Sequence, residues 1–144
     1  MRRAVLTALT VLLGVGAGLA ADDPIAARKE VMKANGSATK TAIGMLKGAT
    51  PFKLEDALAA LKSYMDAADK GPALFPEGSD KGDTKALPTI WANKKDFEAH
   101  FAKLGADSKA ASTAITDEAS FKAKFPSVLK NCGDCHELYR AKDQ

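Results

Sequence analysis

Cysteine is scarce in this 144-residue sequence, which contains only two, and aromatic residues make up 6% of the chain. β-Branched residues are also sparse, and no stretch shows the alternation of apolar and polar residues that marks a strand. The excess of positive charge is only +3, which gives no indication of a nucleic-acid-binding surface. These shortages argue against a β-rich fold and against a nucleic-acid partner.

The residues that are abundant favour helices. Alanine and lysine are frequent, 46% of the chain is hydrophobic and 27% is charged, which is ordinary for a globular protein. The length suits one modest domain with its own core.

A long apolar run occurs only at the N-terminus. The basic "MRR" precedes "AVLTALTVLLGVGAGLA", and Gly18 and Ala20 occupy the −3 and −1 positions before Ala21. This pattern predicts a secretory signal peptide over residues 1–20, cleaved to leave a mature domain of residues 21–144 in a bacterial periplasm. A retained membrane anchor is the alternative, but the run is short and contains three glycines.

The mature chain reads as four amphipathic helices. Asp23 and Pro24 provide a cap and a first helical residue, and Gly48 can end the first helix. A break at Gly105 is possible in the third helix, Thr116 can cap the fourth, and Pro126 should kink the fourth or mark a late start. The four expected ranges are about 23–47, 53–70, 88–115 and 117–141. Short connections between such helices predict an all-α, antiparallel four-helix bundle.

The last helix holds both cysteines, in "FPSVLKNCGDCHELYR". On a helix, Cys132, Cys135 and His136 lie three and four residues apart and share one face. Two thiols one turn apart can each form a thioether with a haem vinyl group, and the adjacent histidine then becomes an axial ligand of the iron. The pattern therefore predicts one covalent haem c on the C-terminal helix, with Cys132 and Cys135 as thioether donors and His136 as proximal ligand.

The sequence disfavours three other uses of the two cysteines. A thioredoxin-like redox site belongs to a βαβ setting, which this sequence lacks. A structural zinc site needs four ligands, and only the distant His100 could complete the set. A plain disulfide would close a very small loop and would stabilise little.

The chain resembles the class II cytochromes c, the cytochrome c′ family, which carry Cys-x-x-Cys-His near the C-terminus on the last of four helices. "NCGDCHELYR" carries the most specific part of the resemblance. "RKEVMKANG", "LFPEGS" and "IWANKKDF" resemble the first helix, the middle loop and the third helix of the family.

The resemblance also implies further site residues. Met32 matches the methionine that ligates the iron in low-spin members of the family, and a core methionine is the alternative. Met45 and Met65 match no ligand position. Arg28 resembles the family arginine that faces a haem propionate, with a solvated surface arginine as the alternative. Arg140, four residues after His136, is a second candidate for a propionate.

A haem iron with both axial positions filled has no open site, so the expected function is one-electron transfer and not enzymatic catalysis. The expected partners are redox proteins, and the chain is expected to be a monomer or a homodimer. Four lysines near the haem-bearing helix would guide acidic partners: Lys122, Lys124, Lys130 and Lys142. The alternative is a five-coordinate cytochrome c′ that binds nitric oxide or carbon monoxide. A thiol-disulfide protein without haem is a third interpretation.

Overall fold

Residues 23–142 are described by the computed structural model, and the predicted signal peptide lies outside them. Within this range the chain forms α1 (Pro24–Leu46), α2 (Leu54–Lys70), the short 3-10 helix η1 (Gly71–Leu74), α3 (Thr89–Ala92), α4 (Lys94–Ala114) and α5 (Glu118–Tyr139). The only β-type pairing in the described chain is an isolated bridge between Ala86 and Arg140. Between residues 23 and 142, no helix combines the length and the apolar character needed to cross a bilayer.

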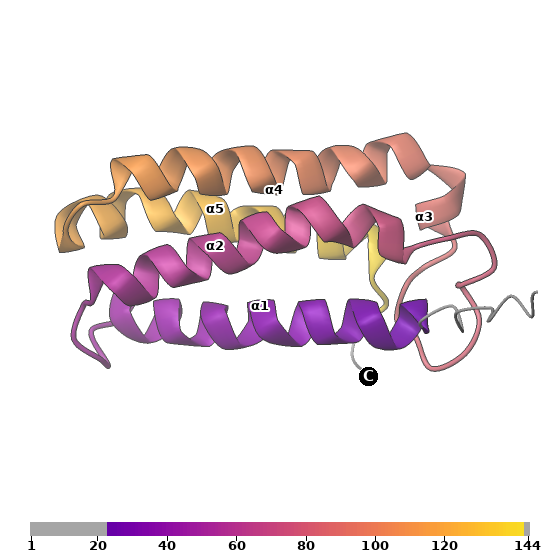
Figure 1. The fold of residues 1–144 in the computed structure, drawn as a ribbon, viewed down its shortest axis with the longest axis horizontal. Helices are drawn as coiled ribbons and strands as arrows, with labels where there is room; N and C mark the ends of the chain where they lie inside the picture. The colour runs from indigo at the N-terminus through magenta and orange to yellow at the C-terminus, as the bar shows by residue number, and fades with distance from the viewer. Residues whose placement is uncertain (1–22, 143–144) are drawn as a thin grey trace, which may run out of the picture.

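The four long helices lie side by side and alternate in direction, which confirms the predicted antiparallel bundle (Figure 1). The close neighbours are α1 with α2, α2 with α4, and α4 with α5. Up-and-down connectivity brings the start of α1, the end of α5 and segment 75–88 to one end of the bundle. Short turns connect the helices at the opposite end.

Side-chain caps fix the beginnings of the first and last helices, α1 and α5. The Asp23 carboxylate accepts hydrogen bonds from the backbone N–H groups of Ile25 (2.9 Å) and Ala26 (3.3 Å), as expected for an N-cap. The cap of α5 is Asp117, whose side chain accepts from the N–H of Ser120 at 2.8 Å, and the Ser120 hydroxyl accepts from the N–H of Asp117. The cap predicted from the sequence, Thr116, was therefore wrong by one residue.

The third predicted helix is divided at a different residue from the one expected. It breaks at Asn93, between α3 and α4, and α4 continues through Gly105 without interruption. A Cβ atom at Gly105 would lie 3.0 Å from the Cβ of Ala68, so this glycine permits the close approach of α2 and α4. Pro126 lies inside α5, which does not start late.

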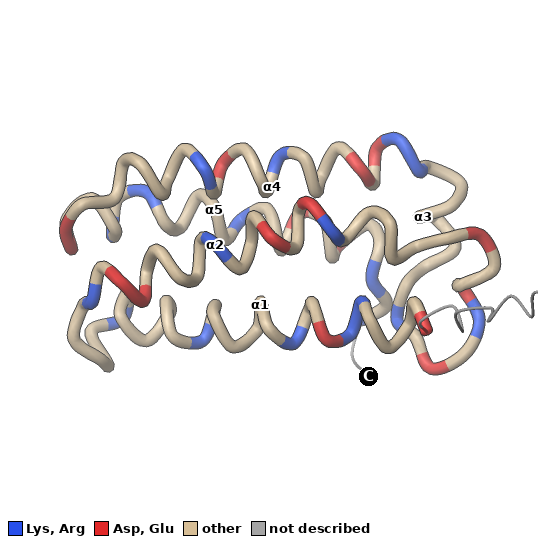
Figure 2. The backbone as a smooth tube through the Cα atoms, viewed as in Figure 1, with Lys and Arg blue, Asp and Glu red and all other residues tan. Residues whose placement is uncertain are grey.

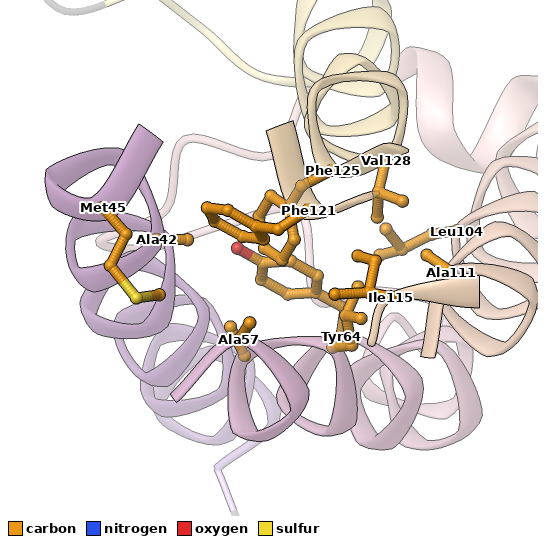
Figure 3. Packing of buried hydrophobic residues seen from close by; sticks show 12 residues of the cluster. Ala42, Met45, Ala57, Tyr64, Leu104, Ala111, Ile115, Phe121, Phe125 and Val128 are labelled. Carbon is orange, nitrogen blue, oxygen red and sulfur yellow. The ribbon is translucent and has the colours of Figure 1, made fainter. Parts of the chain in front are cut away.

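The hydrophobic interior consists of two clusters. The first lies towards the short-turn end and includes the fully buried Leu61. Tyr64, Phe121 and Phe125 belong to the same cluster (Figure 3). The second lies at the other end and comprises Phe75, Ile90, Phe97, Phe101 and Tyr139, with Met32 and Cys135 packed against it. Cys135 of the motif therefore packs against the second cluster.

One buried hydroxyl leads to a stability prediction. Ser108 of α4 is fully buried, and its Oγ has no hydrogen-bond partner among the described residues. Ser108→Ala removes this unsatisfied group and improves helix propensity, so we expect a gain of about 1 kcal/mol in the free energy of unfolding. Urea unfolding measures the gain.

Ser112→Ala is the control for this prediction, because the Ser112 hydroxyl lies on the same helix but donates to the Lys109 carbonyl at 2.8 Å. A Ser108→Ala protein less stable than the parent would show that the hydroxyl has a partner in solution.

Candidate functional site

A cavity of about 370 Å³ opens at the end of the bundle where α1, α5 and segment 75–88 meet. Its walls are mainly apolar and come from α1, α3, α4, α5 and segment 75–88: Met32, Phe75, Ala86, Ile90, Phe97, Phe101 and Tyr139. Four cations and one carboxylate add charge to the lining: Arg28, Lys29, Lys85, Arg140 and Asp83. Its size lies within the range of small-molecule and cofactor sites.

The Cys-x-x-Cys-His motif lies in the last turns of α5. Cys135 and His136 line the cavity, whereas Cys132 lies one turn earlier, half-buried, and is not among the lining residues. The pKa of the Tyr64 phenol on α2 is raised to about 12, mainly by burial and in smaller part by the charge of a Cys132 thiolate. The three motif residues therefore follow one helix from the bundle interior to the cavity wall.

The electrostatics of the two thiols oppose a redox-active dithiol. Burial raises the pKa of both thiols, that of Cys135 to about 11, so both are protonated at neutral pH. Reactive Cys-x-x-Cys pairs owe their lowered pKa to a helix N-terminus or a nearby cation. Here the pair lies near the C-terminus of α5, where the helix dipole disfavours a thiolate.

His136 lies at the mouth of the cavity with part of its ring open to solvent. The protein atoms packed around the ring desolvate it and lower its pKa, and the positive charge of Arg140 lowers that pKa further. The imidazole is therefore held neutral, which is the form that binds a metal ion.

A zinc site finds no support in residues 23–142, where no group of three or more His, Cys, Asp and Glu side chains could hold a metal ion. His100 lies on α4, with its Nε2 3.6 Å from the Asp96 carboxylate and its ring 5.8 Å from that of Tyr139. It does not complete a ligand set with the two cysteines.

The three methionines of the described chain lie in different surroundings. Met32 of α1 lines the same cavity as His136. Met45 is buried in the first cluster, where its sulfur accepts the Lys53 N–H at 3.3 Å. Met65 of α2 does not line the cavity. Met32 is thus the one described methionine on the cavity wall.

Arg28 is buried, with 5% of its surface exposed, so the alternative of a solvated surface arginine was wrong. Its guanidinium donates to the Ser79 hydroxyl (3.1 Å), to the Ser79 carbonyl (2.5 Å) and to the Thr84 hydroxyl (2.9 Å), and it lies 4.8 Å from the centre of the Phe75 ring. These contacts fasten segment 75–88 to α1 beside the cavity.

Backbone hydrogen bonds near residues 85–87 connect the same segment to the end of α5. The Leu87 N–H donates to the Tyr139 carbonyl at 3.0 Å, and the Ala141 N–H donates to the Lys85 carbonyl at 2.8 Å. The part of this segment in the cavity wall is not apparent from the sequence. Its contacts join residues about 50 positions apart, and no local periodicity signals them.

Charges are distributed along all the long helices (Figure 2). Two of the four lysines expected to guide a partner are paired with carboxylates of their own helix: Lys122 with Glu118 and Lys130 with Asp134, each at 2.6 Å. Such pairing weakens their contribution to a positive docking face.

The cavity suits a haem on chemical grounds. Apolar walls match the macrocycle, two unpaired thiols on one helix match its vinyl groups, and a neutral imidazole and a thioether sulfur match an iron ion. The cations of the lining suit the two carboxylates of a haem. A four-helix bundle with Cys-x-x-Cys-His beside such a cavity defines the class of bundle-type c cytochromes.

Comparison with known proteins gives the same assignment. A family model described as Cytochrome C' matches residues 23–140. A cytochrome c′ of Rhodopseudomonas palustris is 47% identical over 133 residues, covering 92% of this chain and 91% of the relative. A cytochrome c-556 of Agrobacterium tumefaciens is 35% identical, covering 80% and 94%.

A solved cytochrome c′ structure from Rhodopseudomonas palustris superposes with a TM-score of 0.82 at 46% identity, covering 85% of this chain and 98% of that one. A structural model of oxidised cytochrome c556 from R. palustris gives a TM-score of 0.77 at 28% identity, covering 85% and 98%. The chain belongs to the cytochrome c′ family, whose members carry a covalently attached haem c.

Proposed function

We propose that this chain is an exported one-electron carrier whose haem c is attached to Cys132 and Cys135, with His136 as proximal ligand and Met32 as distal ligand. One observation carries the proposal: Met32 of α1 and His136 of α5 line a single apolar cavity. The two proposed ligands thus come from different helices that line the same cavity.

When bound, the haem supplies a couple between Fe(II) and Fe(III). The chain's own residues would hold and tune it. The thioethers of Cys132 and Cys135 would fix the group along α5, and the Met32 sulfur would favour the reduced state. Phe75, Phe97 and the other apolar residues of the wall would exclude water from the bound group. We propose no substrate turnover.

Arg28 and Arg140 are the proposed partners of the haem carboxylates, because both line the cavity. Arg28 would add its charge from a guanidinium already oriented by Ser79 and Thr84. A positioned guanidinium loses little side-chain entropy on pairing with a carboxylate.

The proposed location is a bacterial periplasm, on the basis of the signal peptide predicted for residues 1–20, with residues 21–144 as the mature domain. Redox proteins are the proposed partners. A monomer and a homodimer are both compatible with this proposal.

A second candidate is a five-coordinate cytochrome c′ that binds nitric oxide or carbon monoxide, with Met32 beside the iron and not bonded to it. The 47% identical relative favours this candidate, because it is named a cytochrome c′. The two candidates differ in one bond, which a spectrum can detect.

Met32→Ala tests the distal bond. In protein produced with cytochrome c maturation machinery, we expect a low-spin ferric spectrum for the parent and a high-spin spectrum for Met32→Ala. The reduction potential of the variant should fall, because the lost thioether sulfur favours the reduced iron. Absorption spectra and potentiometric titration measure both effects.

Met65→Ala is the control, because Met65 lies on α2 away from the cavity lining. A high-spin parent would reject Met32 as ligand and favour the gas-binding candidate, which carbon monoxide titration would then test. A low-spin spectrum unchanged in Met32→Ala would assign the distal bond to another residue. A parent without a Soret band would refute both haem candidates.

A further inference from the structure

A hydrogen-bonded pair joins α4 to the haem-binding end of α5. The Tyr139 hydroxyl donates to the Asp96 carboxylate at 2.5 Å, across 43 positions of sequence. Tyr139 is buried, with 5% exposed, and lines the cavity together with Cys135 and His136. Its ring packs edge-on against Phe97, with 5.2 Å between ring centres. Tyr139 therefore connects a surface carboxylate directly to the cavity wall.

The Asp96 carboxylate lies one hydrogen bond away from the cavity wall, because it accepts from Tyr139, which lines the cavity. That hydrogen bond is the main cause that raises the pKa of Tyr139 to about 12. Asp96 thus places a carboxylate next to the site where the haem would be attached.

The end of α5 is also held from a second direction. The carbonyl of Tyr139 accepts the Leu87 N–H at 3.0 Å, so segment 75–88 fixes its backbone while Asp96 fixes its side chain. A residue tied at both points has little freedom to move relative to α4. His136 lies three residues earlier on the same helix.

We propose that Asp96, acting through Tyr139, lowers the reduction potential of the bound haem and orients the end of α5 that carries His136. The proposal rests on the haem attachment proposed above. A fixed negative charge stabilises the oxidised centre, which is one unit more positive, relative to the reduced centre. Tyr139 is a positioning residue here, because its hydroxyl holds the carboxylate in place.

Asp96→Asn tests the charge while keeping the size of the side chain and an acceptor for Tyr139. We expect the potential to rise, so that at a fixed potential the ratio of reduced to oxidised protein grows roughly threefold. This value allows for solvent screening, since 64% of the Asp96 side chain is exposed. All variants should be measured in one buffer at one pH, because His100 Nε2 lies 3.6 Å from the same carboxylate.

A second readout does not depend on the haem. Asp96→Asn should lower the pKa of Tyr139, because the tyrosinate would no longer face a carboxylate. Ultraviolet titration of tyrosinate follows this change, and a Tyr64→Phe background removes the signal of the other tyrosine. An unchanged Tyr139 pKa would overturn the pairing of Asp96 with Tyr139 in solution.

Glu98→Gln is the matched control. Glu98 lies on the same helix, pairs with Lys94 at 4.0 Å and does not line the cavity. An equal rise of the reduction potential in Glu98→Gln and Asp96→Asn would overturn the proposal. So would the absence of a rise in both variants. Tyr139→Phe tests whether Asp96 acts through Tyr139. In the Tyr139→Phe background, Asp96→Asn should raise the reduction potential by less than it does in the parent. Changes in potential that simply add in the double variant would refute a role for Tyr139.

Failure of this inference is distinguishable from failure of the proposed function. A parent protein that carries no covalent haem refutes the haem attachment itself. A parent with covalent haem whose potential ignores Asp96→Asn refutes only the role of Asp96.

Discussion

A variant with both Cys132 and Cys135 replaced by alanine is expected to be recovered without covalently bound haem. Each thioether needs one thiol, and the described chain has no other cysteine. Their places on consecutive turns of α5 make them a pair that a single flat group can bridge. Haem staining of a denaturing gel measures the loss, because only covalently bound haem stays with the unfolded chain.

The same variant should also lose stability. Without the cofactor the cavity of about 370 Å³ would be left without its apolar filling, and a ligand that binds only the folded state no longer contributes to the free energy of unfolding. Leu138→Ala is the control, because Leu138 lies on the same helix with 51% of its surface exposed. Haem that remains with the unfolded double variant would refute the attachment.

The helical content of the chain could be predicted from local signals. Asp23, Pro24 and Gly48 bound the first helix where the sequence indicated, and Gly48 has the positive φ of 69° that favours glycine. Phe97 and Phe101 lie four residues apart on α4, a spacing that puts them on one helix face, and both are buried. These features depend on residues only a few positions apart, so they could be predicted from the sequence.

The errors have causes that are distant in sequence. Gly105 looked like a helix breaker, but its role is defined by Ala68 on the neighbouring helix. The helix break between α3 and α4 occurs at Asn93, beside two side chains that form hydrogen bonds to segment 75–88. There Trp91 donates to the Pro76 carbonyl at 2.9 Å and Lys94 donates to the Phe75 carbonyl at 2.9 Å. Such tertiary contacts override local propensity.

The candidate site divides in the same way. The motif on α5 was visible because its three residues lie within one turn and a half of helix. The burial of Arg28 and the bond between Asp96 and Tyr139 were not visible, because each depends on how segment 75–88 or α4 packs against another helix. The sequence therefore identified the chemistry of the site better than its electrostatic setting.

The separation of the interior into two clusters leads to the second large expected effect. Phe121→Ala should reduce the free energy of unfolding by about 3–5 kcal/mol, the usual cost of deleting a large buried aromatic ring. Phe121 is fully buried, with ring centres 5.3 Å from Phe52 and 4.9 Å from Phe125. It belongs to the cluster remote from the cavity, so the haem spectrum should stay unchanged.

Phe97→Ala provides the contrast, because Phe97 is equally an aromatic core residue but lines the cavity. It should alter both the free energy of unfolding and the haem spectrum, since the space it leaves lies against the cofactor site. Urea unfolding and the Soret band of each variant measure the two properties on the same samples. A spectrum that changes as much in Phe121→Ala as in Phe97→Ala would mean that the clusters are coupled. The bundle would then have one core serving both stability and cofactor binding. A structural change caused by the missing Phe121 ring would reach His136 through α5.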